Sequence, residues 1–473
     1  MSEDTAYFDS KEFKEILQQY EESVKSGESI YMDADDLADI ADYYHYNNRL
    51  EEANNAIALA MKYNPEAVGP MLYKAREALE KNDFDTAASF ADKIAASDIL
   101  EGDFLQAEIL TKKGQVGDAN KLLKSRLQKL PEEDKGDFIS GVINLFLDFN
   151  EFDYAAKWTV HLPDNFDEVR KNEFMARALF GLEKFEDSEQ LFNNLLDEDP
   201  YSVNYWNALA GVQYMERDYA ACITSCDYAL AINPSSTHSL LTKGNALSDM
   251  RNYEEALTCF KKYTELEPDD EIGYLQQGSC LICMDQPEAG IQLFEKAASL
   301  ADKDSVHLPD IYMELAFAYN TIGNIDKAIW YLDATAPLDC DHINILISKG
   351  HLLLQNKRFE ESMKAFNTAM QLSNNDPQTR LRIIISYQDN RYLNDAYKAY
   401  TEFFNSVDKD YTEGYAYMAL CCLDLKKKEE YLYYLKKACT CNPQEAKRVF
   451  EPIFPEGMEP QDYFEYASSH LND

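Results

Sequence analysis

Cysteine and histidine are the residues of this chain whose types could support metal binding, redox or nucleophilic chemistry. The sequence has ten cysteines and seven histidines. Cys280 and Cys283 have the spacing of half a zinc site or of a redox pair, but no second pair lies nearby. Cys439 and Cys441 are equally isolated, and no histidine stands at metal-ligand spacing from a cysteine or an acid. We therefore expect reduced cysteines in buried or half-buried positions as small apolar residues, with no metal site.

An acidic run that begins at Asp33 is the other candidate for a cation site. An EF-hand loop needs glycine at its sixth position and glutamate at its twelfth, where this run has Ala38 and Tyr44. Acids early in a helix also interact favourably with its dipole, and that is our interpretation of the run. The chain contains no glycine-rich phosphate loop, His-Glu-x-x-His or Gly-x-Ser-x-Gly motif. We predict no catalytic residue, no cofactor and no enzyme activity.

Composition narrows the class of protein and of partner. The 473 residues exceed what one hydrophobic core organises, and 17 glycines with 15 prolines are too few for an all-β chain with many tight turns. Lys+Arg number 45 and Asp+Glu 85, so the net charge is −40. This charge keeps a long chain soluble and disfavours nucleic acid and anionic membranes as partners. Because no apolar run approaches the roughly 18–20 residues of a membrane span and the start lacks a secretory pattern, we expect a cytoplasmic protein.

The elements that position all of these residues follow from an internal repeat. Pro200, Pro234 and Pro268 are 34 residues apart. Between them the sequence repeats one pattern, which is an apolar i, i+3, i+4 helix face, a polar turn, and a second helix with a small residue on its inner face. Proline ends each second helix because it lacks an N–H and clashes with the preceding turn.

Large and small residues alternate within this pattern in a way that predicts close helix crossings. Gly244, Gly278 and Gly290 stand where two helices approach, and Phe260 and Phe294 fill the space between hairpins. The pattern resembles the tetratricopeptide repeat family, and the chain resembles long cytoplasmic multi-repeat proteins of bacteria. The resemblance implies an all-α fold, a right-handed α-solenoid of about twelve helix-turn-helix hairpins with N- and C-terminal capping helices.

The repeat extends over nearly the whole chain. The small second-helix position recurs as Ala53, Ala87, Ala119, Ala155, Ser188, Cys222, Ala256, Gly290, Ala328, Ser362 and Ala396, and Tyr431 departs from it in the last hairpin. The register is irregular near 100–165, where Arg126 and Thr159 occupy places that should be small or apolar. We predict an N-terminal cap at 1–33, repeats at 34–200 and 201–445, and a C-terminal cap at 446–473. The C-terminal segment could be a lid on the last repeat, which we favour, or a tail in the groove of the solenoid.

The family resemblance implies that the first helix of each hairpin lines a concave binding surface. Its polar residues are predicted to be Arg170, Arg177, Asn204, Asn207, Tyr214, His238 and Asn245. Its apolar residues are predicted to be Leu275, Ile282, Met313, Phe317, Ile347, Leu354, Leu381 and Ile385. An exposed apolar stripe is typical of a binding site, although neighbouring repeats could also bury these residues.

Two functions fit this surface. The first is an interaction scaffold or adaptor that binds a protein segment, either a peptide or a helix, along its concave surface. The alternative is a ligand-responsive regulator that senses a peptide or a small acidic molecule near residues 170–245. We expect protein or peptide partners and neither nucleic acid nor membrane, and the sequence leaves the oligomeric state open.

Overall fold

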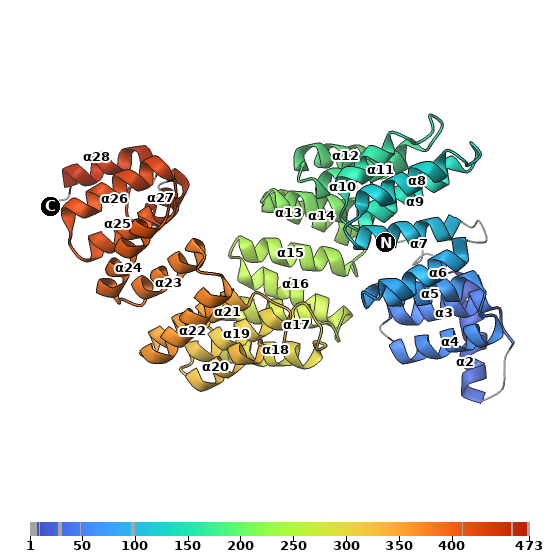
Figure 1. Cartoon of the computed structure of the whole chain (residues 1–473), viewed down its shortest axis with the longest axis horizontal. Coiled ribbons are helices and arrows are strands. Elements are labelled where there is room, and N and C mark those ends of the chain that lie inside the picture. Colours follow the sequence, from blue (N-terminus) through green and yellow to red (C-terminus); the bar gives the residue numbers. More distant parts are fainter. Residues whose placement is uncertain are drawn as a thin grey trace. The chain divides into compact units, whose positions relative to one another are not determined.

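The secondary structure of the chain, seen in a computed structural model, is helical throughout the part described. The structure describes residues 7–8, 10–26, 31–47, 49–95, 100–408, 410–455 and 457–470. These ranges contain 27 helices, α2 to α28, and no strand. The chain divides into two compact units, Met1–Ala246 and Leu247–Asp473, which are described separately below (Figure 1).

The first unit begins with α2 (Lys11–Ser26) and continues as six helical hairpins. The paired helices are α3 (Ala34–Tyr46) with α4 (Leu50–Tyr63), α5 (Val68–Glu80) with α6 (Phe84–Ala95), α7 (Leu100–Lys112) with α8 (Val116–Leu127), α9 (Lys135–Asp148) with α10 (Phe152–Thr159), α11 (Glu168–Gly181) with α12 (Phe185–Glu198), and α13 (Val203–Met215) with α14 (Tyr219–Ile232). Helix α15 (Thr237–Asp249) crosses the division between the units.

The second unit contains α16 (Tyr253–Leu266), five hairpins and two final helices. The paired helices are α17 (Glu271–Cys283) with α18 (Pro287–Leu300), α19 (Leu308–Thr321) with α20 (Ile325–Ala334), α21 (His342–Gln355) with α22 (Phe359–Leu372), α23 (Pro377–Asp389) with α24 (Leu393–Ser406), and α25 (Tyr415–Asp424) with α26 (Lys428–Cys441). Helices α27 (Pro443–Phe450) and α28 (Pro460–His470) follow. With α15 and α16, which are consecutive in sequence, these make twelve helix pairs, and the predicted all-α solenoid of hairpins is confirmed.

One backbone conformation recurs in the turns inside the hairpins. A residue with positive φ follows the first helix at Asn82, Gly114, Asn150, Glu183, Arg217, Arg251, Asp285, Gly323, Lys357, Arg391 and Lys426. In the turn after α15, the Asn252 N–H donates to the Leu247 carbonyl and the Arg251 N–H to the Ser248 carbonyl, both at 2.8 Å. These bonds are those of a Schellman helix end, which reverses the chain into the second helix.

The small second-helix residues lie at the centre of the hairpins, as predicted. Ala53, Ala256 and Ala396 are completely buried. Serine serves equally well at this position because its hydroxyl finds an acceptor on the first helix. The Ser188 hydroxyl donates to the Ala176 carbonyl, and that of Ser362 to a carbonyl on α21, both at 2.8 Å. A buried hydroxyl is tolerated when it is hydrogen-bonded.

Glycine on the first helix makes room for an aromatic ring of the second. A Cβ at Gly278 would lie 2.4 Å from a ring carbon of Phe294, and one at Gly350 would lie 2.2 Å from a ring carbon of Phe366. Both rings are buried in the apolar core. Any side chain at these glycines would therefore force the two helices of the hairpin apart.

The hairpins near 100–165 keep the fold despite their irregular sequence. Arg126 Nε on α8 lies 3.1 Å from an Asp103 carboxylate oxygen on α7, which compensates the cost of placing a largely buried guanidinium there. The Thr159 side chain is buried, and its hydroxyl donates to the Ala156 carbonyl at 2.7 Å. Polar pairing thus replaces the expected small or apolar residue at both places.

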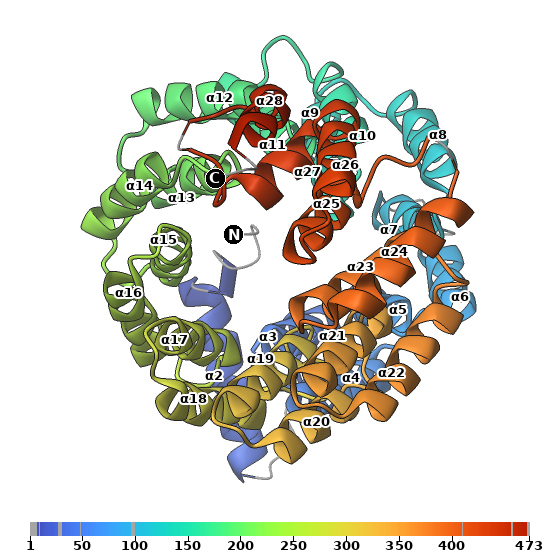
Figure 2. The same cartoon turned by 90° about the vertical axis from the view of Figure 1, so that its left-hand side faces the viewer.

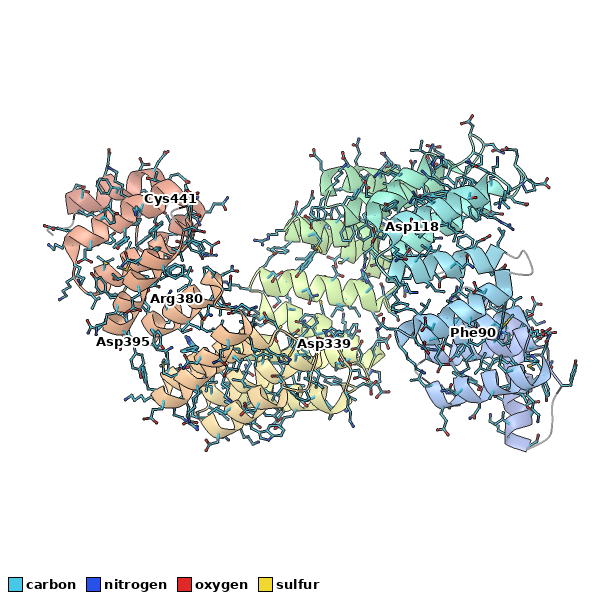
Figure 3. All side chains as sticks on the ribbon, in the orientation of Figure 1. Phe90, Asp118, Asp339, Arg380, Asp395 and Cys441 are labelled. Atoms are coloured by element: carbon cyan, nitrogen blue, oxygen red, sulfur yellow. The ribbon has the colours of Figure 1, made fainter. Side chains whose placement is uncertain are left out.

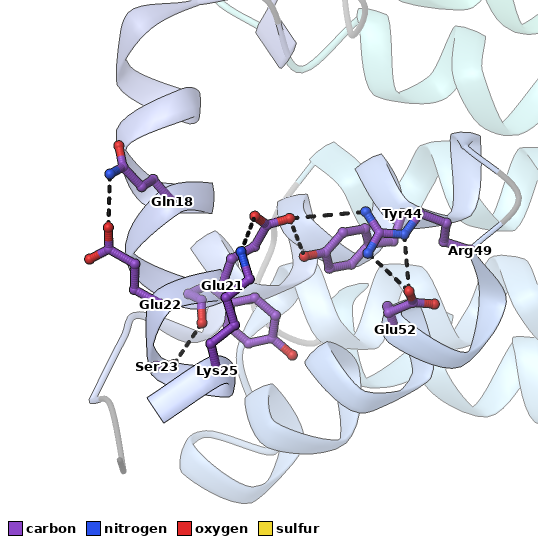
Figure 4. A network of polar contacts seen from close by, with 9 residues as sticks. Gln18, Glu21, Glu22, Ser23, Lys25, Tyr44, Arg49 and Glu52 are labelled. Carbon is purple, nitrogen blue, oxygen red and sulfur yellow. Dashed lines mark hydrogen bonds and ion pairs between the residues drawn. The ribbon is translucent and has the colours of Figure 1, made fainter. Parts of the chain in front are cut away.

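A polar network joins α2 to the first hairpin (Figure 4). The Glu21 carboxylate accepts a hydrogen bond from the Tyr44 hydroxyl at 3.3 Å and lies 4.0 Å from the Arg49 guanidinium. Arg49 also bonds to Glu52 at 2.9 Å, and this bond lowers the pKa of the Glu52 carboxyl. The predicted N-terminal cap is thus held by contacts specific to this end of the chain.

The final helices cover the last hairpin. Figure 2 shows α26, α27 and α28 side by side, and α27 also packs on α25. Phe450 and Tyr463 are buried there, and the Phe454 ring stacks on Tyr463 with 4.2 Å between centroids. This is the arrangement predicted for a lid on the last repeat.

Candidate functional site

The candidate site in the first unit is a surface formed by the first helices α9, α11 and α13. It begins on α11, where Arg170 and Arg177 are two turns apart on one face. The Arg177 guanidinium donates to the Asn144 amide oxygen on α9 at 3.5 Å. The Arg170 guanidinium lies about 6 Å from the ring centroids of Phe166 and Phe174. Both arginine side chains are half-buried and contact neighbouring side chains.

The polar surface continues from α11 to α13 and to the start of α15. The Tyr205 hydroxyl donates to the Glu173 carboxylate at 3.3 Å, and burial raises the Tyr205 pKa to about 12. The Asn207 amide donates to the Ser236 hydroxyl at 3.4 Å and accepts a hydrogen bond from the Ser239 hydroxyl. These bonds join residues about one repeat apart, so each first helix is tied to the next by polar side chains. We call this row the polar seam, made of Asn144, Glu173, Arg177, Tyr205 and Asn207.

The other predicted polar residues lie beside this seam but differ in exposure. Asn204 and His238 are exposed, whereas Asn245 is half-buried. The Tyr214 ring lies 5.7 Å from that of Tyr219 in the same hairpin, which makes it part of the hairpin packing. Of the seven predicted residues, Arg177 and Asn207 therefore belong directly to the seam.

The predicted apolar surface in the second unit is largely core. Leu275, Ile347, Leu354 and Leu381 are buried, between 1% and 6% exposed. They pack in two apolar clusters of that unit. The expectation that they line an open groove is corrected, because neighbouring hairpins cover them.

The remaining apolar residues keep some contact with solvent. Ile282, Met313 and Ile385 are half-buried and pack against the same two clusters. Phe317 is 40% exposed on α19. A role in binding for these four residues stays a prediction.

A row of amides in the second unit escaped the sequence analysis. Asn356 donates to the Asn320 amide oxygen at 2.8 Å, and Asn320 donates to Gln355 at 2.9 Å. Asn390 continues the row, 3.3 Å from His351 Nδ1. The three asparagines recur at nearly the repeat period, which is the signal that could have revealed them. They tie the ends of successive first helices together.

The residues singled out for metal or redox chemistry have other roles. The Asp33 carboxylate accepts from the Asp35 N–H at 2.9 Å and caps α3, while Asp35 accepts from the Gly69 N–H at 2.8 Å. Within the described ranges no group of three or more His, Cys, Asp or Glu could hold a metal ion. Cys283 and Cys441 are exposed, which corrects the expectation that all cysteines are at least half-buried (Figure 3 labels Cys441). Nor is any helix in the described ranges long and apolar enough to cross a membrane.

Family models now identify the repeat. One tetratricopeptide repeat model matches residues 237–270 and 343–376, and a second matches residues 175–237. The chain therefore contains tetratricopeptide repeats. The matches cover the part of the chain with the most regular sequence, and the same hairpin continues on both sides of them.

The individual proteins that resemble this chain are distant from it in sequence. It is 22% identical over 171 residues to anaphase-promoting complex subunit 3 of Schizosaccharomyces pombe, a match that covers 36% of this chain and only a quarter of the relative. Among solved structures, MamA of Desulfovibrio magneticus RS-1 is 17% identical with a TM-score of 0.33, covering 36% of this chain and 93% of that one. Yeast Tom70 is 13% identical with a TM-score of 0.45, covering 93% and 96%.

Proposed function

We propose that the protein is a non-enzymatic interaction scaffold, and that an extended or helical segment of a partner protein lies along the first helices of the first unit. The observation that carries this proposal is the polar seam, a row of fixed hydrogen-bonding groups contributed by successive hairpins. A guanidinium has five N–H donors. Within the described residues the Arg177 bond to Asn144 engages one of them, which leaves donors for a partner's carbonyl or carboxylate groups.

Further support comes from the net charge of the chain and from the name of its relative. With a net charge of −40, the surface opposes binding of nucleic acid or anionic membrane, so a protein or peptide is the partner class that fits. The curated relative is by name a subunit of a multi-protein complex. The alternative of a ligand-responsive regulator uses the same residues, and no separate contact favours it.

Partner capture tests the seam residue Arg177 together with Arg170, which lies two turns away on the same face of α11. Proteins retained from a lysate of the source organism by immobilised wild-type chain are compared with those retained by the double variant Arg170→Glu/Arg177→Glu. We expect the retained partner to be lost, and its affinity measured with the purified partner to fall by about tenfold or more.

The matched control reverses two positive charges on second helices instead. Lys121 on α8 and Lys157 on α10 are largely exposed, 79% and 67% at the side chain. The variant Lys121→Glu/Lys157→Glu should retain the partner, with circular dichroism showing that both variants are folded. A partner that binds both double variants as well as wild type would rule out the seam as the binding surface.

A further inference from the structure

The last hairpin and the C-terminal helix line an open pocket whose residues are distinct from those of the polar seam. It has a volume of about 370 Å3. Its apolar lining includes Tyr431, Ile453, Phe454, Tyr466 and Ala467. The turn between α25 and α26 forms another part of the lining and supplies three consecutive lysines, Lys426, Lys427 and Lys428.

The charged residues that line this pocket are basic, because the lining includes three lysines and neither Asp nor Glu. Residues 426–448 hold seven lysines and arginines against three glutamates, whereas residues 449–470, which form the other wall, hold five Asp and Glu and no Lys or Arg. The positive charge is therefore confined to the turn side of the pocket. Lys426 and Lys428 have exposed side chains. These lysines attract negatively charged groups of a partner over the range of a Debye length, about 8–10 Å.

The third lysine is part of the pocket wall. Lys427 lies 3.0 Å from the Glu430 carboxylate, and its ammonium lies 3.9 Å from the Tyr397 ring centroid. These contacts fix the turn that carries its two neighbours. The positive rim is therefore held in place over the apolar lining.

The pocket coincides with the one hairpin that lacks a small residue at the inner second-helix position. Eleven hairpins have a small residue at the inner second-helix position, and the last has Tyr431, which lines the pocket. Its ring packs edge-on against Phe450 of α27, with 6.4 Å between centroids. The replacement of a small residue by tyrosine thus belongs to a surface made only where α27 and α28 cover the repeat.

We propose that this pocket binds an acidic segment of a partner protein. One apolar or aromatic side chain of that segment inserts between Ile453 and Tyr466. Carboxylates next to it in the segment pair with Lys426 and Lys428. The volume suits one large side chain rather than a folded surface. The two lysines select carboxylates by charge, and the apolar lining selects the anchor residue. This interaction is independent of the polar seam, which lies in the other unit.

The test selects ligands without assuming a natural partner. A phage library of random dodecapeptides is selected on the immobilised full chain, and enriched peptides are synthesised and titrated by fluorescence anisotropy. We expect sequences with Asp or Glu next to Phe, Leu, Ile or Trp. Their binding should weaken about tenfold or more with Lys426→Glu/Lys428→Glu, and similarly with Ile453→Asp.

Matched controls place the same changes elsewhere in the second unit. Lys364→Glu/Lys398→Glu reverses two exposed lysines on α22 and α24, and Leu372→Asp alters an apolar residue that is 54% exposed. Both should bind the peptides like wild type. Three results overturn the proposal: no enriched peptide, enriched peptides without acids, or binding unaffected by the pocket substitutions. A labelled single-stranded oligonucleotide is titrated in parallel, and lysine-dependent binding of it without peptide binding would assign the surface to nucleic acid instead.

Discussion

At the scale of single residues, the helical glycines of this chain differ in whether an added methyl group would fit. Gly278 and Gly211 both lie in first helices, but a Cβ at Gly278 would meet the buried Phe294 ring, whereas one at Gly211 would meet nothing within 4 Å. Alanine is favoured over glycine in a helix by about 0.5–1 kcal/mol when space permits. The two positions should therefore respond to the same substitution with opposite sign.

The first prediction compares these two glycines. Gly278→Ala should lower the free energy of unfolding by about 1–3 kcal/mol, because the core must be overpacked to accept it. Gly211→Ala should raise it by about 0.5–1 kcal/mol. Urea unfolding followed by circular dichroism measures both. Equal effects of the two substitutions would mean that the Phe294 ring moves aside freely.

A second prediction concerns the ten cysteines. Burial raises the pKa of the Cys421 thiol to about 11 and that of Cys422 to about 12, whereas Cys283 and Cys441 are exposed. Since the thiolate is the reactive form and a thiol of pKa about 11 is about one part in a thousand ionised near pH 8, buried thiols should react slowly with a chromogenic disulfide reagent.

The native chain should show a fast phase of thiol modification that Cys283→Ser/Cys441→Ser removes. The slow thiols should become accessible when urea unfolds the chain. A fast phase that persists in the double variant would show that a half-buried cysteine, Cys340 or Cys439, or a buried one is also accessible to the reagent.

At the scale of elements, the hairpin turn is the repeated unit, and most of its positive-φ residues are not glycine. An L-residue in this conformation costs roughly 1–2 kcal/mol relative to a right-handed one. Arg251 has φ 62° and Gly323 has φ 78°, in equivalent turns of the second unit. The repeat therefore keeps a modest strain in many of its turns, which replacement by glycine should relieve.

The third prediction uses this pair of turns. Arg251→Gly should raise the free energy of unfolding by about 0.5–1 kcal/mol, because relief of strain outweighs the added flexibility of the unfolded chain. Gly323→Ala should lower it by about 1 kcal/mol, although a Cβ there meets no atom within 4 Å. Urea midpoints of the two variants check the signs. A loss of stability in Arg251→Gly would indicate that the arginine side chain makes stabilising contacts.

The helices and their pairing were predictable from the sequence because both leave a periodic record. Proline spacing, the small second-helix residue and the apolar i, i+3, i+4 face each repeat with the hairpin. The solvent exposure of individual first-helix residues does not follow from this periodic pattern. Ile347 and Leu381 read like groove residues, yet both are buried by neighbouring hairpins. Because one position along a helix turns a side chain by about 100°, a small error in register decides between groove and core.

The contacts that define the candidate sites were hidden for a related reason. Asn207 finds its partner Ser239 in the next repeat, and the C-terminal pocket forms only because α28 lies against the turn after α25. The single sequence signal for the pocket was Tyr431, the residue that broke the pattern. The C-terminal pocket was therefore indicated by a residue that departs from the repeat, and not by the repeat pattern itself.

At the scale of the whole molecule, the net charge of −40 opposes folding, because compaction brings like charges together. Isolated surface ion pairs, such as Lys121 with Asp118, offset little of this, since exposed pairs contribute about 0–1 kcal/mol each. Salt screens both the pairs and the repulsion, but the repulsion involves many more charges. The relief of charge repulsion by salt should therefore outweigh the weakening of the ion pairs.

The fourth prediction is that stability rises with sodium chloride. The Debye length falls from about 30 Å at 0.01 M to about 3 Å at 1 M, so most of the long-range repulsion is removed over this range. The apparent melting temperature should increase by several degrees, at about 2–4 °C per kcal/mol for units of this size. Sodium chloride is preferred to sulfate, which stabilises most proteins by being excluded from their surface. A melting temperature that stays constant or falls with salt would show that local ion pairs outweigh the repulsion due to the net charge. It would also weaken the argument that the lysines of the C-terminal pocket differ electrostatically from the rest of the chain.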